Sequence, residues 1–125
     1  MHVLIDGHHG EPARLESMQL VYDVLDELPA RIAMTKIMPP YVFRYTGAKA
    51  EDWGVSGFVL IAESHISIHT FPEHGLIHVD IFSCKEFSAE LAIEYVREKF
   101  GLRDTSHRTL GRGLENREGP ICDLT

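Results

Sequence analysis

The chain has 125 residues and a net charge of −7 at pH 7, with hydrophobic and charged fractions of 44% and 25%. These values are typical of one soluble globular domain, spanning residues 1–125, and the acidic balance argues against nucleic acid as a partner. No apolar run approaches the roughly 20 residues of a membrane span, and the N-terminus lacks the features of a signal peptide, so we expect a cytoplasmic protein without a membrane partner.

The first half of the chain is predicted to hold one helix with strands on both sides of it. Residues 14–30 predict a helix, because Met18, Val21, Leu25 and Leu28 form one apolar stripe. Pro39-Pro40 interrupts an extended, aromatic segment, which predicts an edge strand or a kinked one. The strands expected in this half cover residues 2–6, 32–45 and 58–62.

The second half predicts a hairpin, a second helix and a last strand. Residues 76–84 alternate, which predicts a core face made by Ile77, Val79 and Ile81 and an opposite, functional face. That functional face is expected to carry His78, Asp80, Phe82 and Cys84. Ser88 is a suitable N-cap and Gly101 a suitable C′ residue for a helix over residues 88–100. The other strands expected here cover residues 65–70 and 106–110.

This order of elements predicts an α+β fold. We expect a two-layer sandwich, in which an antiparallel sheet carries both helices on one face. The opposite face of the sheet must then be solvated or paired with a partner.

Ser64 is the most informative residue for function. It follows Glu63 at the point where one apolar strand ends and another begins, so the backbone must bend there. A strained peptide beside a hydroxyl is prone to attack by that hydroxyl. Attack by Ser64 on the carbonyl of Glu63 would convert the amide to an ester. Elimination would release the N-terminal piece and leave a dehydroalanine, which hydrolyses to a pyruvoyl group.

The histidines and the cysteine near Ser64 allow other interpretations. His65 and His69 have a familiar spacing of metal ligands, but four residues of strand span about 13 Å, so we favour polar residues on a strand face and expect no metal. Cys84 and His69 could form a nucleophile and its base, as in a cysteine hydrolase. Alternatively, Cys84 is a small buried apolar residue. Together with Cys122 it is too little for a disulfide framework.

Four short stretches in this region resemble the small prokaryotic S-adenosylmethionine decarboxylases. The resemblance is dense over residues 54–87, and residues 2–6 are similar to the first strand of that family. The four stretches are Gly54-Val55-Ser56-Gly57, Ala62 to Thr70, Pro72-Glu73 and Asp80 to Cys84.

The resemblance implies that the chain cuts itself between Glu63 and Ser64. It would give a β chain of residues 1–63 and an α chain of residues 64–125, with Ser64 becoming a pyruvoyl cofactor. In the family, this group forms a Schiff base with the substrate amine and acts as an electron sink when carbon dioxide leaves. The substrate implied is the small molecule S-adenosylmethionine, and the pathway is the biosynthesis of spermidine and other polyamines.

The resemblance also implies roles for individual residues. His69 and Ser56 match residues that assist processing, and Cys84 matches the acid that protonates the decarboxylated carbon. Glu73 matches a carboxylate that binds the ribose hydroxyls of the substrate. Members of the family pair as homodimers of such αβ units, with active sites near the interface.

One position departs from the family pattern. Ala50 stands where the family has an aromatic ring that stacks on the adenine of the substrate. Trp53, Phe43 or Tyr45 is a candidate to supply the ring, and we count Trp53 and Phe71 with Glu73 as substrate-binding residues.

The sequence also allows other functions. The same scaffold hosts pyruvoyl-dependent ornithine and arginine decarboxylases, and the acidic Glu51-Asp52 pair could meet the cationic end of such a substrate. A non-catalytic homologue that never processes, and a cysteine hydrolase that uses Cys84, are the remaining alternatives.

Overall fold

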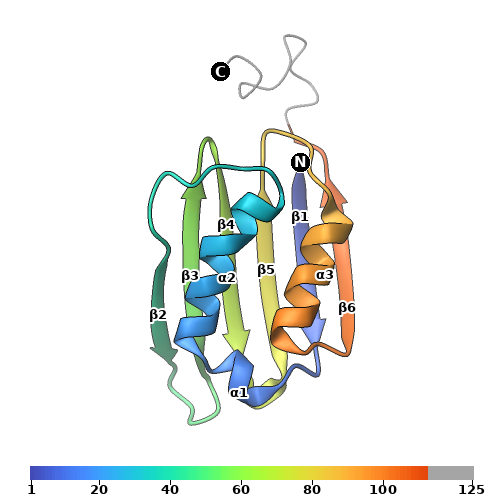
Figure 1. Ribbon diagram of the computed structural model, residues 1–125. Helices are drawn as coiled ribbons and strands as arrows, with labels where there is room; N and C mark the ends of the chain where they lie inside the picture. The colour runs from blue at the N-terminus through green and yellow to red at the C-terminus, as the bar shows by residue number, and fades with distance from the viewer. Residues whose placement is uncertain (113–125) are drawn as a thin grey trace.

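The computed structural model describes residues 1–112. Its six strands form one antiparallel sheet in the order β2-β3-β4-β5-β1-β6. Helices α2 and α3 lie side by side across one face of this sheet (Figure 1), which confirms the predicted two-layer α+β sandwich. The strands are β1 (His2–His8), β2 (Tyr41–Thr46), β3 (Trp53–Ile61), β4 (Ser64–Phe71), β5 (Leu76–Phe82) and β6 (Asp104–Leu110), and the helices are α1 (Pro12–Leu15), α2 (Met18–Arg31), the 3-10 helix η1 (Pro72–His74) and α3 (Ala89–Phe100).

The helix caps explain where the helices begin and end. Ser88 caps α3 by accepting a hydrogen bond from the Leu91 N–H at 3.1 Å, and Gly101 ends it with a φ of +63°, both as predicted. The single helix predicted over residues 14–30 is divided into α1 and α2. The division occurs because Ser17 is an N-cap, whose hydroxyl accepts from the Leu20 N–H at 3.0 Å.

The segment predicted to be extended over residues 32–45 is a strand only in its last part, where β2 begins after Pro39-Pro40. Proline cannot donate a hydrogen bond to a neighbouring strand, so it separates this edge of the sheet into two pieces. The other piece is a short contact between Lys36 and Ile61 at the end of β3. Figure 1 shows the loop before β2 crossing the end of the sheet where β3 meets β4.

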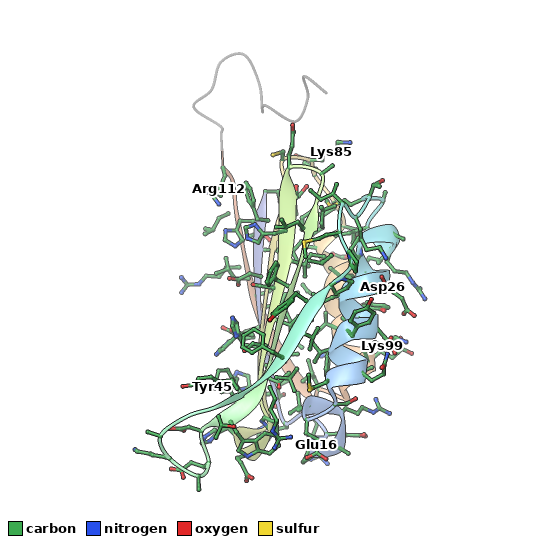
Figure 2. The ribbon with its side chains drawn as sticks, turned by 90° about the vertical axis from the view of Figure 1, so that its left-hand side faces the viewer. Glu16, Asp26, Tyr45, Lys85, Lys99 and Arg112 are labelled. Carbon is green, nitrogen blue, oxygen red and sulfur yellow. The ribbon has the colours of Figure 1, made fainter. Side chains whose placement is uncertain are left out.

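The core lies between the sheet and the helices. The predicted core residues of β5, which are Ile77, Val79 and Ile81, are fully buried there. They pack with branched residues of β1, β3 and β4 and with the apolar stripes of α2 and α3. Figure 2 shows that the opposite side of the sheet carries side chains without a helix over them. We call this side the open face.

No helix in the described part of the chain is long and apolar enough to cross a membrane. Cys122 and most of the tail after Gly111 lie outside the described residues.

Candidate active site

The peptide between Glu63 and Ser64 lies in the turn that joins β3 to β4. β3 ends at Ile61 and β4 begins at Ser64, so Ala62 and Glu63 make a two-residue turn. Glu63 has a φ of +60°, and a residue with a side chain adopts this left-handed conformation at a cost of about 1–3 kcal/mol. Gly or Asn usually occupies such a position in a turn. The bend expected from the sequence is therefore present, and it is strained.

Ser64 and Cys84 meet at this turn. The Ser64 side chain points to the helix-covered side and is only 7% exposed. The Cys84 N–H donates to the Ser64 hydroxyl at 3.4 Å, and the Cys84 Sγ lies 3.3 Å from the carbonyl oxygen of Glu63. The backbone of Ser83 is held by two hydrogen bonds with Met1, which keeps Cys84 beside the turn. Three of the predicted site residues are thus brought together.

Ser56 and His69 form a separate pair. They are directly opposite each other on β3 and β4, and the Ser56 hydroxyl lies 2.8 Å from Nδ1 of His69. His69 follows Ser64 by five residues on the same strand, a distance of about 16 Å. An odd step along a strand also reverses the face, so His69 lies on the open face and Ser64 on the covered one. Within one chain the structure does not bring this pair to Ser64.

The open face has a cavity beside Ser56 and His69. Its volume is about 330 Å³, and three aromatic rings line it, from Phe43, Tyr45 and Phe71. Figure 2 shows Tyr45 near one end of β2, on the side of the sheet away from the helices. Gly54 also lines the cavity, and a Cβ there would lie 1.8 Å from the Thr70 carbonyl oxygen, so no other residue fits without a backbone shift.

Trp53 is separated from this cavity. It lies three residues before Ser56 on β3, which places its ring on the opposite face of the sheet. Its indole N–H donates to Glu73 at 3.2 Å, and the Arg44 guanidinium lies 4.4 Å from its ring centre. Ala50 lies in the loop between β2 and β3 and does not line the cavity. Phe43 and Tyr45 therefore line this cavity, and Trp53 does not.

Sequence reasoning did not single out one hydrogen-bonded pair, which joins Asp6 and His78. Nδ1 of His78 lies 2.6 Å from the Asp6 carboxylate, and His78 is directly opposite His69 on the neighbouring strand. The alternation in β5 placed His78 on the functional face. The contact with Asp6 depends on the pairing of β1 with β5, which are far apart in the sequence.

In the part of the chain that the structure describes, no group of three or more His, Cys, Asp or Glu residues could hold a metal ion. His65, one of the two histidines with a ligand-like spacing, lies with its ring centre 5.5 Å from that of Phe82.

Comparisons with known proteins point to one family. A family model described as S-adenosylmethionine decarboxylase matches residues 1–113. The chain is 34% identical over 113 residues to the S-adenosylmethionine decarboxylase proenzyme of Archaeoglobus fulgidus, a match that covers 90% of this chain and 96% of that protein. It is 30% identical over 118 residues to the proenzyme of the same name from Pyrococcus furiosus, with coverages of 94% and 81%.

A solved structure agrees with these relatives. The crystal structure of the adenosylmethionine decarboxylase of Aquifex aeolicus VF5 superimposes with a TM-score of 0.78. The sequences are 28% identical, and the match covers 94% of this chain and 93% of that one. These matches lend no support to an ornithine or arginine decarboxylase, to a non-catalytic homologue or to a cysteine hydrolase.

Proposed function

This chain belongs to the S-adenosylmethionine decarboxylase family, and we propose that it is a precursor that cuts its own backbone between Glu63 and Ser64. As a member of the family it is a decarboxylase. The observation that carries the proposal is the strained turn at Glu63, where Cys84 contacts both the Glu63 carbonyl oxygen, through its Sγ, and the Ser64 hydroxyl, through its N–H. The products would be residues 1–63 and residues 64–125.

The proposed cleavage uses groups of the chain and one water molecule. The Ser64 Oγ attacks the Glu63 carbonyl carbon, and the C–N bond breaks to give an ester and a free amine on residue 64. Loss of the Cα proton then expels the Glu63 carboxylate and leaves a dehydroalanine. Its imine form takes up water and releases ammonia, which leaves a pyruvoyl group at the start of the second fragment. The strain at Glu63 favours the first step, because breaking the C–N bond removes the turn that holds the φ of Glu63 in the left-handed region.

The surroundings of Ser64 fit the pyruvoyl group of this family. The residue is nearly enclosed, beside a small cavity of about 90 Å³. When formed, the group supplies an electron sink for the loss of carbon dioxide. Cys84 lies next to the same position, and we propose that in its reduced form it returns a proton to the substrate carbon. Under reducing conditions, Cys84→Ala should still allow cleavage and should lower kcat.

We further propose that the enzyme acts as a homodimer through its open face. The Ser56–His69 pair cannot assist Ser64 of its own chain, because it lies about 16 Å away on the other side of the sheet. A second copy could bring its pair to the end of the sheet where the Ser64 turn lies. Three large apolar side chains on this face are exposed in the single chain: Phe43 by 43%, Phe58 by 38% and Leu60 by 40%. Such an apolar surface is typical of one that a second copy covers.

The proposed substrate is S-adenosylmethionine. The aromatic cavity beside His69 is suited to a flat, aromatic base, because aromatic rings stack on the face of such a base. One carboxylate oxygen of Glu73 accepts a hydrogen bond from the Trp53 indole N–H, and this bond orients the carboxylate. The carboxylate can also accept hydrogen bonds from ribose hydroxyls. We also propose that the enzyme works in the cytoplasm and serves polyamine biosynthesis.

A panel of carboxyl-labelled amino acids tests this function. Wild-type protein should release labelled carbon dioxide from S-adenosylmethionine and not from ornithine or arginine. Ser64→Ala should leave the chain uncut and abolish the release. Release from ornithine or arginine alone would overturn the substrate, and undiminished release by Ser64→Ala would overturn the pyruvoyl mechanism.

A further inference from the structure

Residues 35–37, which we call the clamp segment, form backbone hydrogen bonds with residues 60–62, at the strained turn and just before it. The Ala62 N–H donates to the Thr35 carbonyl at 3.1 Å, and the Ile37 N–H donates to the Leu60 carbonyl at 3.1 Å. Between these two hydrogen bonds, Lys36 forms an antiparallel bridge with Ile61. The clamp segment thus pairs with the end of β3 on the side opposite β4.

The clamp segment is itself anchored to the helix layer. The chain reverses after α2 at Ala33, which has a φ of +60°, and the Met34 N–H donates to the Pro29 carbonyl at 2.8 Å. The Lys36 ammonium also contacts the carboxylate of Asp26 on α2. The clamp segment is therefore fixed to α2 through Met34, which precedes it, and through Lys36 at its centre. Because of these contacts, it does not move with β3 if the β3–β4 hairpin shifts.

A left-handed residue with a side chain persists only where its surroundings leave it no alternative. On one side of the turn, Ser64 is held by its pairing with Ile61 at the start of β4. On the other side, Ala62 would be free to move without the hydrogen bond to Thr35. We propose that the clamp segment positions the turn for self-cleavage by preventing Glu63 from relaxing into an ordinary conformation. This inference rests on the proposed self-processing and adds the element that holds its strained geometry.

Two proline substitutions remove the clamp hydrogen bonds one at a time. Ala62→Pro suits the first central position of the turn, where proline is common, and it removes only the donor to Thr35. Ile37→Pro removes the donor to Leu60 and leaves Lys36 extended, as it already is in the bridge. Met38→Pro is the matched control, because no backbone hydrogen bond of the described residues uses the Met38 N–H.

The full-length chain is made in a cell-free system, and the appearance of the two fragments is followed by mass spectrometry. Thermal unfolding of each variant, with Ser64→Ala added to keep it uncut, reports whether it folds. Ala62→Pro and Ile37→Pro should each slow cleavage about 2- to 10-fold, as expected for one hydrogen bond. Met38→Pro should cleave at the wild-type rate.

The outcomes distinguish a failure of the positioning role of the clamp segment from a failure of the proposed self-cleavage. If Ala62→Pro folds and cleaves at the wild-type rate or faster, the clamp segment has no positioning role while the proposed function stands. Ala62→Pro decides the case if Ile37→Pro does not fold. A wild-type chain that remains uncut would overturn the proposed self-processing, and this inference with it.

Discussion

The Ser56 hydroxyl and Nδ1 of His69 are 2.8 Å apart, on the face of the sheet that Ser64 does not share. The pair is aligned by direct cross-strand pairing. It is therefore preformed in each chain, and the homodimer that we propose would bring it to Ser64 of a second chain.

Two inactive variants test the shared site. Ser64→Ala and His69→Ala, each expressed alone, should remain uncut. When they are expressed together with different tags, mixed dimers join an intact Ser64 to an intact His69 from the other chain. The His69→Ala chain should then be cut, and mass spectrometry identifies it by its tag. If neither chain is cut in dimers that demonstrably mix, the two residues do not act across an interface.

The strain at Glu63 predicts a difference between two small substitutions. Glycine adopts a φ of +60° without strain, whereas alanine does not. Glu63→Gly should therefore slow self-cleavage by about 5- to 30-fold, which corresponds to the 1–2 kcal/mol of a left-handed residue. Glu63→Ala keeps the strain and should cleave close to the wild-type rate. Equal rates for the two variants in a fragment time course would show that the strain does not contribute.

The aromatic cavity predicts which rings bind the substrate. Phe43→Leu and Tyr45→Leu should each raise the KM for S-adenosylmethionine by about 5- to 150-fold, because one stacked base is worth about 1–3 kcal/mol. Tyr41→Leu is the control, since Tyr41 lies on the same face of β2 but does not line the cavity. An unchanged KM in both cavity variants would place the base elsewhere.

Tyr95 connects the two long helices. Its hydroxyl donates to the Glu27 carboxylate at 2.8 Å. Burial, and then this hydrogen bond, raise the pKa of Tyr95 far above its ordinary value. Tyr95→Phe should lower the free energy of unfolding near neutral pH by about 1–3 kcal/mol in urea titrations.

The same pKa shift predicts a loss of stability in alkali. Above about pH 10 the unfolded chain loses the Tyr95 proton while the folded chain keeps it, so the free energy of unfolding falls as the pH rises. Repeating the urea titrations at about pH 7 and about pH 10.5 measures this loss. Tyr95→Phe should show a smaller loss than the wild type, and an equal loss would contradict the assignment.

The sequence predicted the contacts between neighbouring strands of this site better than the contacts between residues far apart in the chain. Glu63 and Ser64 lie in one of the matched stretches and Cys84 ends another, and their contact follows from a hairpin and the strand beside it. The division of the first helix depended on Ser17, whose capping role lay inside an otherwise periodic stretch. The apolar pattern continues through that break, so periodicity alone could not reveal it.

The long-range contacts were harder to predict. The pairing of β1 with β5 brings Asp6 to His78, although the two residues are 72 positions apart. The clamp segment pairs with β3 only because Ala33 reverses the chain after α2. Phe43, Tyr45 and Trp53 were all candidates for a stacking ring because each is aromatic. Only the strand register shows that Trp53 lies on the other face of the sheet from Phe43 and Tyr45.

The intact mass of the purified protein shows whether the chain becomes a pyruvoyl enzyme. We predict two fragments, with the C-terminal one lighter than Ser64–Thr125 by the mass of one ammonia molecule. Ser64→Ala, prepared in parallel, should give one uncut chain of 125 residues. A wild-type protein that stays as one uncut chain, or a C-terminal fragment that retains an ordinary serine at its start, would contradict a pyruvoyl enzyme.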